Sequence, residues 1–492
     1  MKTHGTFWAV TTILWVIAAS LTSCALGPNY QRPALDVPKA FKSAATQPAA
    51  APRLDLTWWR LFGDKTLAQL EESALQGSQD LKAAMARVAE ARASSAAVRS
   101  QFFPTITFDP SVLRNSTPGT GNSKRPEGQT SVQIPFDLGY EIDIWGRVRR
   151  SFESSEATAQ ASEIDAQVVR LTLLADVAVG YFTLRSLDAQ DEILTRNIDL
   201  YHHQIDLTQT QFRTGITDRT AVLQAQVQLD STLTQLTELR RQRADQEHAL
   251  AILTGRPPSE LSLKVKPLDL APPEIPPGLP IDLLRYRPDV AEAEQNLRAA
   301  NALIGVAVAN FFPVVKLSGA AGFENNDAAN VSQILNWKSR FWSLGPTVTA
   351  PIFEGGLLTA NLAQAKAKCI ELQATYRGTV LTAFQNVEDA LTDMHMQAGE
   401  AQSQARAVAN SREYLALAVV QYRKGLITYL QVIDAERTLL TNEITAAQIL
   451  NQRLAATVAM IKALGGGWDA QTPPLQAATS KPSTAPSAAP RK

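Results

Sequence analysis

The chain has little of what enzymes and metal proteins use for chemistry. Its 492 residues include only two cysteines, five histidines and five methionines. It contains no nucleophile elbow, no phosphate-binding loop and no His-Glu-x-x-His metal helix. The adjacent His202 and His203 would project about 100° apart on a helix, so we expect them on a solvated face and not around one ion. We therefore predict a protein that is not an enzyme and that needs no cofactor.

Charge of one sign is not in excess either. Lys plus Arg equals Asp plus Glu at 47 each, so no overall basic field attracts nucleic acid. Aromatic residues make up only 7%, and Ala, Gln, Leu and Thr are abundant, which indicates long helices. Acidic residues such as Asp188, Asp191 and Glu192 are interpreted as exposed helix charge.

The N-terminus lacks an apolar run of the roughly 20 residues that a membrane-spanning helix needs. A shorter run from Phe7 to Ala19, behind Lys2, is typical of a secretory signal peptide. It ends in Leu-Thr-Ser-Cys, which resembles a lipobox and predicts a leader over 1–23 with an acylated Cys24, sorted to the outer membrane because Ala25 follows. The alternative is an ordinary signal with a chance cysteine. An acylated Cys24 leaves Cys369 without a disulfide partner, and Cys369 is expected to be buried on an apolar stripe.

An internal repeat organises the rest of the chain. Three short sequences recur 209 or 210 positions later: Phe102-Phe103-Pro104 as Phe311-Phe312-Pro313, Gln211–Gly215 as Gln421–Gly425, and Leu253-Thr254-Gly255 as Ala463-Leu464-Gly465. The predicted organisation is a segment 24–64, a first repeat 65–256, a Pro-rich linker 257–280, a second repeat 281–468 and a disordered tail 469–492. Each repeat begins with a helical segment, Leu67 to Gln101 and Asp289 to Asn310.

Two extended segments follow in each repeat, near 104–144 and 313–353. Between Ser131 and Asp143, apolar side chains occupy one parity and polar ones the other, so one face of a strand is apolar. Three weaker segments, one of them containing Ile106 and Val112, alternate in the same way. The pattern fits membrane strands facing lipid and lumen, and it fits a soluble two-sheet subdomain equally well.

If the strands lie in a membrane, four of them cannot close a barrel, because the smallest closed barrels have about eight. Strands must then be pooled between subunits. A dimer would supply eight and a trimer twelve, and the count alone does not choose.

Two long helices are predicted from about Trp145 to Arg213 and from about Leu357 to Arg423, since no proline interrupts either. Apolar residues spaced by three and four predict coiled-coil packing along them. Glycine at 215 and 425 predicts a left-handed turn at matching hairpin tips, near 213–218 and 423–428.

Four motifs in order resemble the lipoprotein branch of the TolC-like outer-membrane efflux family, with OprM-like and NodT-like members as the nearest pattern. The motifs are Gly27-Pro28-Asn29-Tyr30-Gln31-Arg32-Pro33, Trp58-Trp59-Arg60-Leu61-Phe62-Gly63-Asp64, Arg287-Pro288-Asp289-Val290 and Ala463-Leu464-Gly465-Gly466-Gly467-Trp468. The resemblance implies a mainly α fold with a membrane β-barrel: a homotrimer of twelve strands, four per chain, over a long periplasmic helical tunnel with an equatorial belt. It further implies a passive efflux duct that serves a periplasmic adaptor and an inner-membrane pump.

The resemblance also implies site residues. Asp434 falls at a constriction aspartate, Leu430 at an apolar constriction, and Arg437 and Tyr422 at positions that bond across neighbouring helices. Spacings of four and three place Leu430, Asp434 and Arg437 on one helix face, which threefold symmetry would turn into rings. A solvated ion pair beside a core leucine is the plainer interpretation. The expected adaptor-docking tips are Arg213, Thr214, Gly215, Arg423, Lys424 and Gly425.

The tips also depart from some relatives, since Gln431 and Ala221 stand where those carry a further acid. Two other architectures compete with an efflux duct. A periplasmic coiled-coil tether would explain the leader and the helices but not the extended segments. A protein-secretion duct shares the architecture, and the terminal motifs favour small-molecule efflux instead.

Overall fold

The structure is a computed structural model that describes residues 25–35, 37–38, 40–42, 54–117, 127–273, 275, 285–325, 334–472 and 475. The predicted leader, Cys24 and most of the predicted tail lie outside the described residues. Contacts divide the chain into two units, Met1–Ala34 with Val88–Ser162 and Ala293–Tyr376, and Leu35–Arg87 with Glu163–Glu292 and Arg377–Lys492. Each unit is described by itself.

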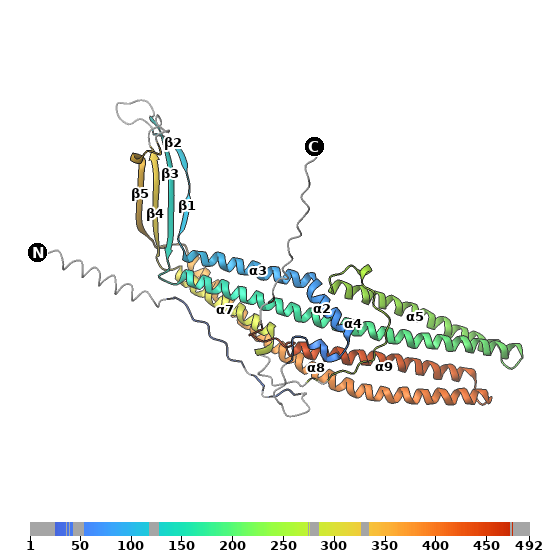
Figure 1. The fold of residues 1–492 in the computed structure, drawn as a ribbon. Coiled ribbons are helices and arrows are strands. Elements are labelled where there is room, and N and C mark those ends of the chain that lie inside the picture. The colour runs from blue at the N-terminus through green and yellow to red at the C-terminus, as the bar shows by residue number, and fades with distance from the viewer. Residues whose placement is uncertain are drawn as a thin grey trace, which may run out of the picture. The chain divides into compact units, whose positions relative to one another are not determined.

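Two copies of one sequence repeat follow each other along the chain, as predicted (Figure 1). The first copy has helix α3 (Gln79–Arg99), strands β1 (Thr105–Phe108), β2 (Ser111–Thr117) and β3 (Glu127–Ile142), and helices α4 (Arg147–Arg213) and α5 (Arg219–Leu253). The second has α7 (Pro288–Ala309), strands β4 (Val314–Asn325) and β5 (Arg340–Thr349), and helices α8 (Leu357–Arg423) and α9 (Tyr429–Ala463). Both long helices have 67 residues and both returning helices have 35, so the copies match in length.

The first helical segment is broken, which the sequence analysis did not predict. Instead of one helix from Leu67, the chain forms α2 (Lys65–Gly77) and α3, with Ser78 in an extended conformation between them. A Cβ added to Gly77 would lie 2.0 Å from the carbonyl oxygen of Thr254. Conversely, a Cβ on Gly255, whose φ is +71°, would lie 2.1 Å from the Gly77 carbonyl oxygen. The helix breaks where two glycine backbones touch, because no side chain fits between them.

The strands form one antiparallel sheet in the order β1-β3-β4-β5, with β2 also pairing β3. The first predicted extended segment is therefore two strands, because the chain leaves the ladder at Asp109-Pro110 and proline cannot donate a ladder hydrogen bond. β1 and β2 occupy the same edge of β3, so the sheet has four antiparallel rows. Its two outer edges, β1 with β2 on one side and β5 on the other, are unpaired within the described chain.

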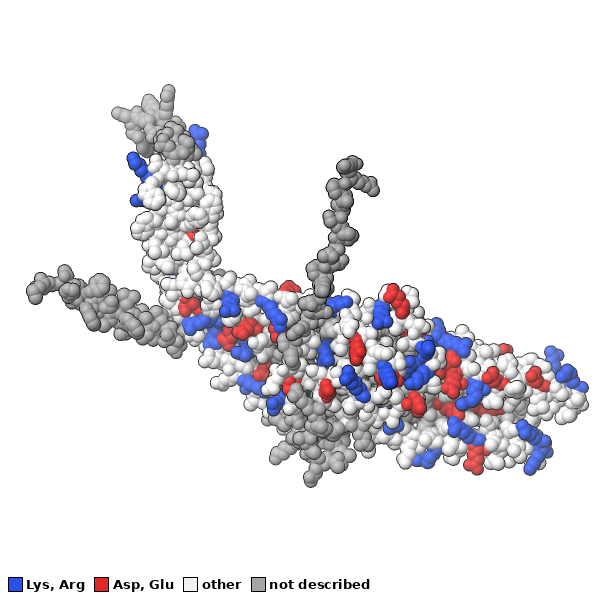
Figure 2. All heavy atoms as spheres, in the orientation of Figure 1, with Lys and Arg blue, Asp and Glu red and all other residues white. Residues whose placement is uncertain are grey.

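One face of the sheet is apolar and open to the surroundings. The register places Phe108, Phe136, Ala321 and Trp342 in line across the strands, on the same face. Phe136 is 56% exposed and Trp342 is 78% exposed. Figure 2 shows almost no charged side chains on the visible surface of the sheet, whereas both signs are dispersed over the helices. An exposed apolar face of this extent marks a surface that something apolar covers.

The second unit has its core around the motif Trp58-Trp59-Arg60-Leu61-Phe62-Gly63-Asp64. Trp58 and Trp59 are buried, and the Phe62 ring lies 4.9 Å from that of Phe182 on α4. Asp64 caps α2 by accepting from the amide nitrogens of Thr66 and Leu67, at 2.7 and 3.0 Å. The motif therefore ends a short 3-10 helix, η1 (Trp58–Phe62), and begins α2 over a shared core.

The long helices bury one stripe, as predicted. Leu171, Ala178 and Phe182 of α4 are buried, as are Tyr376, Val380 and Val387 of α8. A window of α4 is apolar enough and long enough to cross a membrane, but 56% of it is buried within the protein, as in a core helix. Cys369 on α8 is only partly buried, so the prediction of a buried thiol was wrong. Ile370 beside it is 66% exposed, because the apolar stripe of α8 begins further along the helix.

A polar cluster holds the linker that follows α5. Asp188 is fully buried, so the interpretation of this residue as exposed helix charge was wrong. It accepts from Arg185 at 2.7 Å, from Arg243 at 2.6 Å and from the backbone nitrogen of Lys266 at 3.1 Å. Both arginines also donate to linker carbonyls, at Lys264 and Leu263. A buried carboxylate is tolerated here because cations and amides surround it.

The start of the described chain is held against the first unit. The Leu26 nitrogen donates to the Trp145 carbonyl at 3.1 Å, and Arg150 donates to the side chain of Asn29 at 2.6 Å. A Cβ on Gly27 would lie 2.5 Å from the α-carbon of Gly305, and a Cβ on Gly146 would lie 2.8 Å from the α-carbon of Ala25. Residues 25–29 are therefore fixed where β3 ends and α4 begins.

Candidate functional site

The two hairpin tips are built in the same way. α4 ends at Arg213, where the Gly215 and Ile216 nitrogens donate to the carbonyls of Phe212 and Gln211, at 3.0 and 2.8 Å. α8 ends at Arg423 with the same pair of bonds from Gly425 and Leu426, at 2.9 and 3.0 Å. Gly215 and Gly425 have φ of +75° and +73°. The predicted glycine turns are confirmed, and they satisfy the last carbonyls of both long helices.

The tips expose cations and aliphatic side chains. Arg213, Thr214, Gly215, Arg423, Lys424 and Gly425 are all exposed. Next to the glycines, Ile216 is 75% exposed and Leu426 is 70% exposed. Lys and Arg side chains gather at these hairpin ends in Figure 2. Each tip therefore presents an apolar residue beside positive charge.

The returning helices begin differently. Asp218 caps α5 by accepting from the Ala221 nitrogen at 3.1 Å, whereas Thr428 at the start of α9 makes no side-chain cap hydrogen bond. A side-chain cap contributes about 1 kcal/mol to helix stability. The second hairpin is therefore less firmly fixed at its tip than the first.

The three residues predicted to share one face of α9 do share it. Leu430 is 57% exposed, and Asp434 and Arg437 are exposed as well. Neither Asp434 nor Arg437 makes a side-chain hydrogen bond or ion pair to any residue that the structure describes. The plainer interpretation, a solvated ion pair beside a core leucine, was wrong in two respects: the pair is not formed and the leucine is not in the core.

Tyr422 is placed apart from that face. Its hydroxyl donates to the side-chain oxygen of Gln211 on α4 at 2.8 Å, and its ring lies 5.5 Å from that of Tyr429. Burial raises the pKa of Tyr422, which keeps the hydroxyl a donor. Tyr422 thus links the end of α8 to the end of α4, whereas Arg437, predicted to bond across helices in the same way, does not do so within the described chain.

A buried acid behind the exposed face was missed by the sequence analysis. Glu436 is 4% exposed, and its Oε1 accepts from the Gln204 side-chain nitrogen of α4. The same Gln204 accepts from the Tyr429 hydroxyl through its oxygen. Burial raises the pKa of Glu436 to about 7, against the lowering effect of the Gln204 bond. The sequence did contain a signal. Tyr429, Val432 and Leu440 lie on one apolar stripe of α9, and Glu436 occupies a position within that stripe.

A second acid, Glu443, lies further along α9 and connects α9 with α4 and α8. It accepts from Arg196 of α4 at 2.5 Å and from Arg412 of α8 at 2.8 Å, and its own side chain is 8% exposed. Both arginines are more than half exposed. This cluster ties α9 to both long helices at a depth where no gate residue was predicted.

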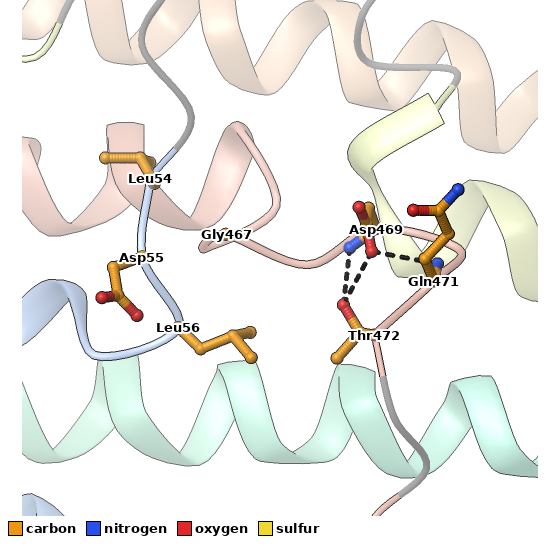
Figure 3. A pocket seen from close by; sticks show the side chains of 7 residues that line it. All are labelled: Leu54, Asp55, Leu56, Gly467, Asp469, Gln471 and Thr472. Atoms are coloured by element: carbon orange, nitrogen blue, oxygen red, sulfur yellow. Dashed lines mark hydrogen bonds between the residues drawn. The ribbon is translucent and has the colours of Figure 1, made fainter.

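A cavity of about 500 Å³ lies at the other end of the second unit, between the segment before η1 and the glycine turn after α9 (Figure 3). Asp469 in its wall accepts from the Gln471 nitrogen and the Thr472 hydroxyl, at 2.9 and 3.1 Å. Asp55 accepts from the Thr57 nitrogen at 3.1 Å. Both carboxylates accept hydrogen bonds from residues of their own turns. The cavity is therefore a gap between the packed segments 54–56 and 467–472. Among the described residues, no group of three His, Cys, Asp or Glu side chains could hold a metal ion.

Comparison with known proteins agrees with this geometry. The family model described as outer membrane efflux protein matches residues 70–256 and 279–466, one match for each repeat. The chain belongs to the outer membrane efflux protein family.

Individual members are similar along nearly all of their length. The pyoverdine export outer membrane protein OpmQ of Pseudomonas aeruginosa is 34% identical over 418 residues, which cover 84% of this chain and 87% of OpmQ. The toluene efflux pump outer membrane protein TtgC of Pseudomonas putida is 32% identical over 470 residues, with 93% and 96% covered. The solved structure of the outer-membrane channel OprN superposes with a TM-score of 0.85 at 33% identity, covering 90% of this chain and all of OprN.

This outer membrane efflux protein is thus an efflux channel component of the outer membrane, with a periplasmic helical extension, and not an enzyme. The TolC-like fold predicted from the motifs is confirmed, with long helices, antiparallel rows of strands and two repeats.

Proposed function

We propose that this outer membrane efflux protein works as a lipid-anchored homotrimer that passively conducts small molecules from an inner-membrane pump and a periplasmic adaptor to the exterior. The observation that carries the proposal is the sheet, which has an exposed apolar face and two unpaired edges. Unpaired backbone groups cannot remain in hydrocarbon, so the edges must meet those of other subunits. Because β1 with β2 and β5 are unlike, subunits join head to tail and close as a ring.

Three subunits are proposed because the family resemblance implies them. Four rows from each of three chains would give a barrel of twelve strands, within the range of known barrels. The opposite face of the sheet would then line the lumen. It carries Gln133, hydrogen-bonded to Glu324 at 3.2 Å, which suits a water-filled passage.

The lipid anchor is proposed on Cys24. The residue after it, Ala25, touches Gly146 at the end of the sheet. Acyl chains attached to the preceding residue would therefore enter the membrane leaflet beside the barrel, and each buried methylene would contribute about 0.8 kcal/mol. Cys24 itself lies outside the described residues.

The periplasmic entrance is proposed at Leu430, Asp434 and Arg437. Threefold symmetry would turn these exposed residues of α9 into rings at successive depths. Apolar rings can close a passage to water, and rings of aspartate favour cations. Tyr422 would hold α8 against α4 behind the rings. The exposed tips, with cations beside Ile216 and Leu426, are the proposed docking surface for the adaptor.

The proposed cargo is small molecules, because similar proteins are named for the export of pyoverdine and toluene. The pump is proposed to choose among them.

The proposal is tested by measuring the mass of the purified oligomer in detergent and its conductance in planar bilayers. A mass of three chains with ion conductance is the expected result. A monomer, a dimer or a non-conducting trimer would contradict it. Replacing Cys24 by Ala should release less protein from membranes than loss of the barrel would, because the proposed anchor only adds to the attachment of an already inserted sheet.

A further inference from the structure

A buried polar cluster joins the two hairpins behind the proposed gate. Glu436 of α9 lies at its centre, on the side of the helix away from Leu430, Asp434 and Arg437. Tyr429, Val432 and Ile433 surround it on the same helix and are buried in the core that α9 shares with α4 and α5. A change in the charge of Glu436 therefore acts on the packing of α9 and not on its exposed face.

One amide spans the joint. Gln204 of α4 donates to Glu436 through its nitrogen and accepts from the Tyr429 hydroxyl through its oxygen. Burial raises the pKa of Tyr429 well above its usual range, so the hydroxyl stays a donor and the amide nitrogen must face Glu436. The second oxygen of Glu436, Oε2, is buried and has no hydrogen-bond partner among the described residues.

The groups that face Glu436 include no cation bonded to it. Tyr201 faces it from α4, and Gln228 of α5 donates to the Tyr201 hydroxyl at 3.4 Å. From α8, the ring of Tyr422 packs on that of Tyr429. On α9 itself, the positive charge of Arg437 acts to lower the pKa of Tyr201. His202 and His203 are exposed on α4 and lie outside the cluster. An ionised Glu436 would therefore be a buried charge with a single neutral donor.

We propose that Glu436 is a proton-controlled latch of the second hairpin: protonated, it holds α9 against α4, and ionised, it releases α9 so that the entrance opens more readily. The proposal rests on the proposed gate, because Leu430, Asp434 and Arg437 are carried by the same helix. The neutral carboxyl keeps the Gln204 bond and avoids a buried charge. The ionised carboxyl gains water when α9 moves away.

The sign follows from the two protonation equilibria. The pKa of Glu436 is about 7 in the closed packing and 4.5 when the side chain is free. The closed packing is thus fully favoured below the lower value and progressively loses that advantage as the pH rises to the higher one. A tenfold change accompanies each unit of difference, so a difference of about 2.5 units raises the opening equilibrium by at most a few hundredfold.

The test compares the purified full-length protein with Glu436→Gln in planar bilayers between about pH 4 and pH 8. Wild type should conduct more, or open more often, as the pH rises from 4.5 to about 7, and should change no further above that value. Glu436→Gln keeps the shape and cannot ionise, so it should stay at the acid level at every pH. Gln226 occupies the matched position of the first hairpin, 210 residues earlier, so the other repeat carries an amide there. His202→Gln combined with His203→Gln is the matched control and should keep the wild-type profile.

A wild-type conductance and an α9 exchange rate that both stay constant with pH, or a Glu436→Gln profile that follows a pH-dependent wild type, overturns the latch. Hydrogen exchange of the α9 backbone, measured at the same pH values on the same oligomers and corrected for intrinsic exchange, gives a second readout that does not depend on the gate. Faster exchange of wild type at high pH with equal conductance would support the release of α9 but contradict the gate. Raised conductance of Asp434→Ala with Arg437→Ala, beside pH-independent exchange, would support the gate but contradict the latch.

Discussion

The first and second hairpins have equal lengths and equal glycine turns, but they are fastened in different places. The first is fixed at its tip by the Asp218 cap and at its base by the Asp188 cluster, which binds the linker. The second lacks a side-chain cap at Thr428 and has polar contacts to α4 from the first half of α9, at Glu436 and Glu443. Duplication thus gave two hairpins of one shape, of which the first has a side-chain cap at its tip and the second does not.

The matched positions make the divergence explicit. Leu430, Asp434, Glu436 and Arg437 correspond to Thr220, Gln224, Gln226 and Val227 in the first hairpin, each 210 residues earlier. Every ionisable group at these positions belongs to the second hairpin. Control of the duct is therefore expected to depend on α9 and not on α5.

The largest expected effect tests what the hairpins share. Gly255→Ala and Gly465→Ala place a Cβ 2.1 Å and 2.0 Å from backbone oxygens that cannot move aside. Both variants should fail to accumulate as folded oligomers, measured by heat-modifiable bands on gels of outer-membrane fractions. Gly215→Ala and Gly425→Ala are the controls, because their positive φ is similar but nothing lies within 4 Å, and they should cost only about 1 kcal/mol each. Equal losses at base and tip would show that backbone conformation, and not contact, sets the cost.

The base of the first hairpin should be the next most sensitive place. Asp188→Ala leaves Arg185, which is 4% exposed, without its carboxylate, and breaking a buried pair costs about 3 to 5 kcal/mol. Thermal unfolding should show the loss, and proteases should cut the linker after α5 more rapidly. Asp191→Ala removes a pair in which Arg240 is 58% exposed, and it should cost less than about 1 kcal/mol. If the two variants unfold alike, the buried cluster does not hold the linker.

The gate can be tested by treating the hairpins as each other's control. Asp434→Ala combined with Arg437→Ala should raise single-channel conductance severalfold, because two rings of charged side chains would be removed from the proposed constriction. Gln224→Ala combined with Val227→Ala alters the matched positions of α5 and should leave conductance unchanged. Equal responses from both hairpins would place the constriction elsewhere.

The smallest effect concerns the cap. Thr428→Asp should supply the cap that α9 lacks and stabilise the second tip by about 0.5 to 1 kcal/mol. Hydrogen exchange at the start of α9 should slow by roughly twofold to fivefold, a ratio that follows from this energy. Asp218→Thr is the reverse change and should speed exchange at the start of α5. No change in either would mean that packing alone fixes both tips.

Regular features of this molecule could be predicted from the sequence because they depend on local pattern. α8 spans Leu357–Arg423 as predicted, since no proline enters it and Gly425 ends it. The apolar parity of Ser131 to Asp143 placed one face of β3 correctly, and β3 extends further back to Glu127. The shared face of Leu430, Asp434 and Arg437 followed from helical spacing alone.

Features that depend on contacts distant in sequence could not be found in this way. The break after Gly77 exists because Gly255 approaches it from the end of α5. The burial of Asp188 depends on a linker about 80 residues later, at Lys264 and Lys266. Glu436 needed Gln204, from the other repeat, before its carboxylate could be recognised as part of a joint.

The fixed start of the chain has a consequence for biogenesis. Gly27 and Gly146 leave room for backbone only, so residues 25–29 occupy a slot with no space for a bulky or displaced segment. The predicted leader over 1–23 would be separated from the first residue of this slot by Cys24 alone. Filling of the slot by residues 25–29 therefore depends on two glycines, and we expect a side chain on either Gly27 or Gly146 to hinder the assembly of the duct.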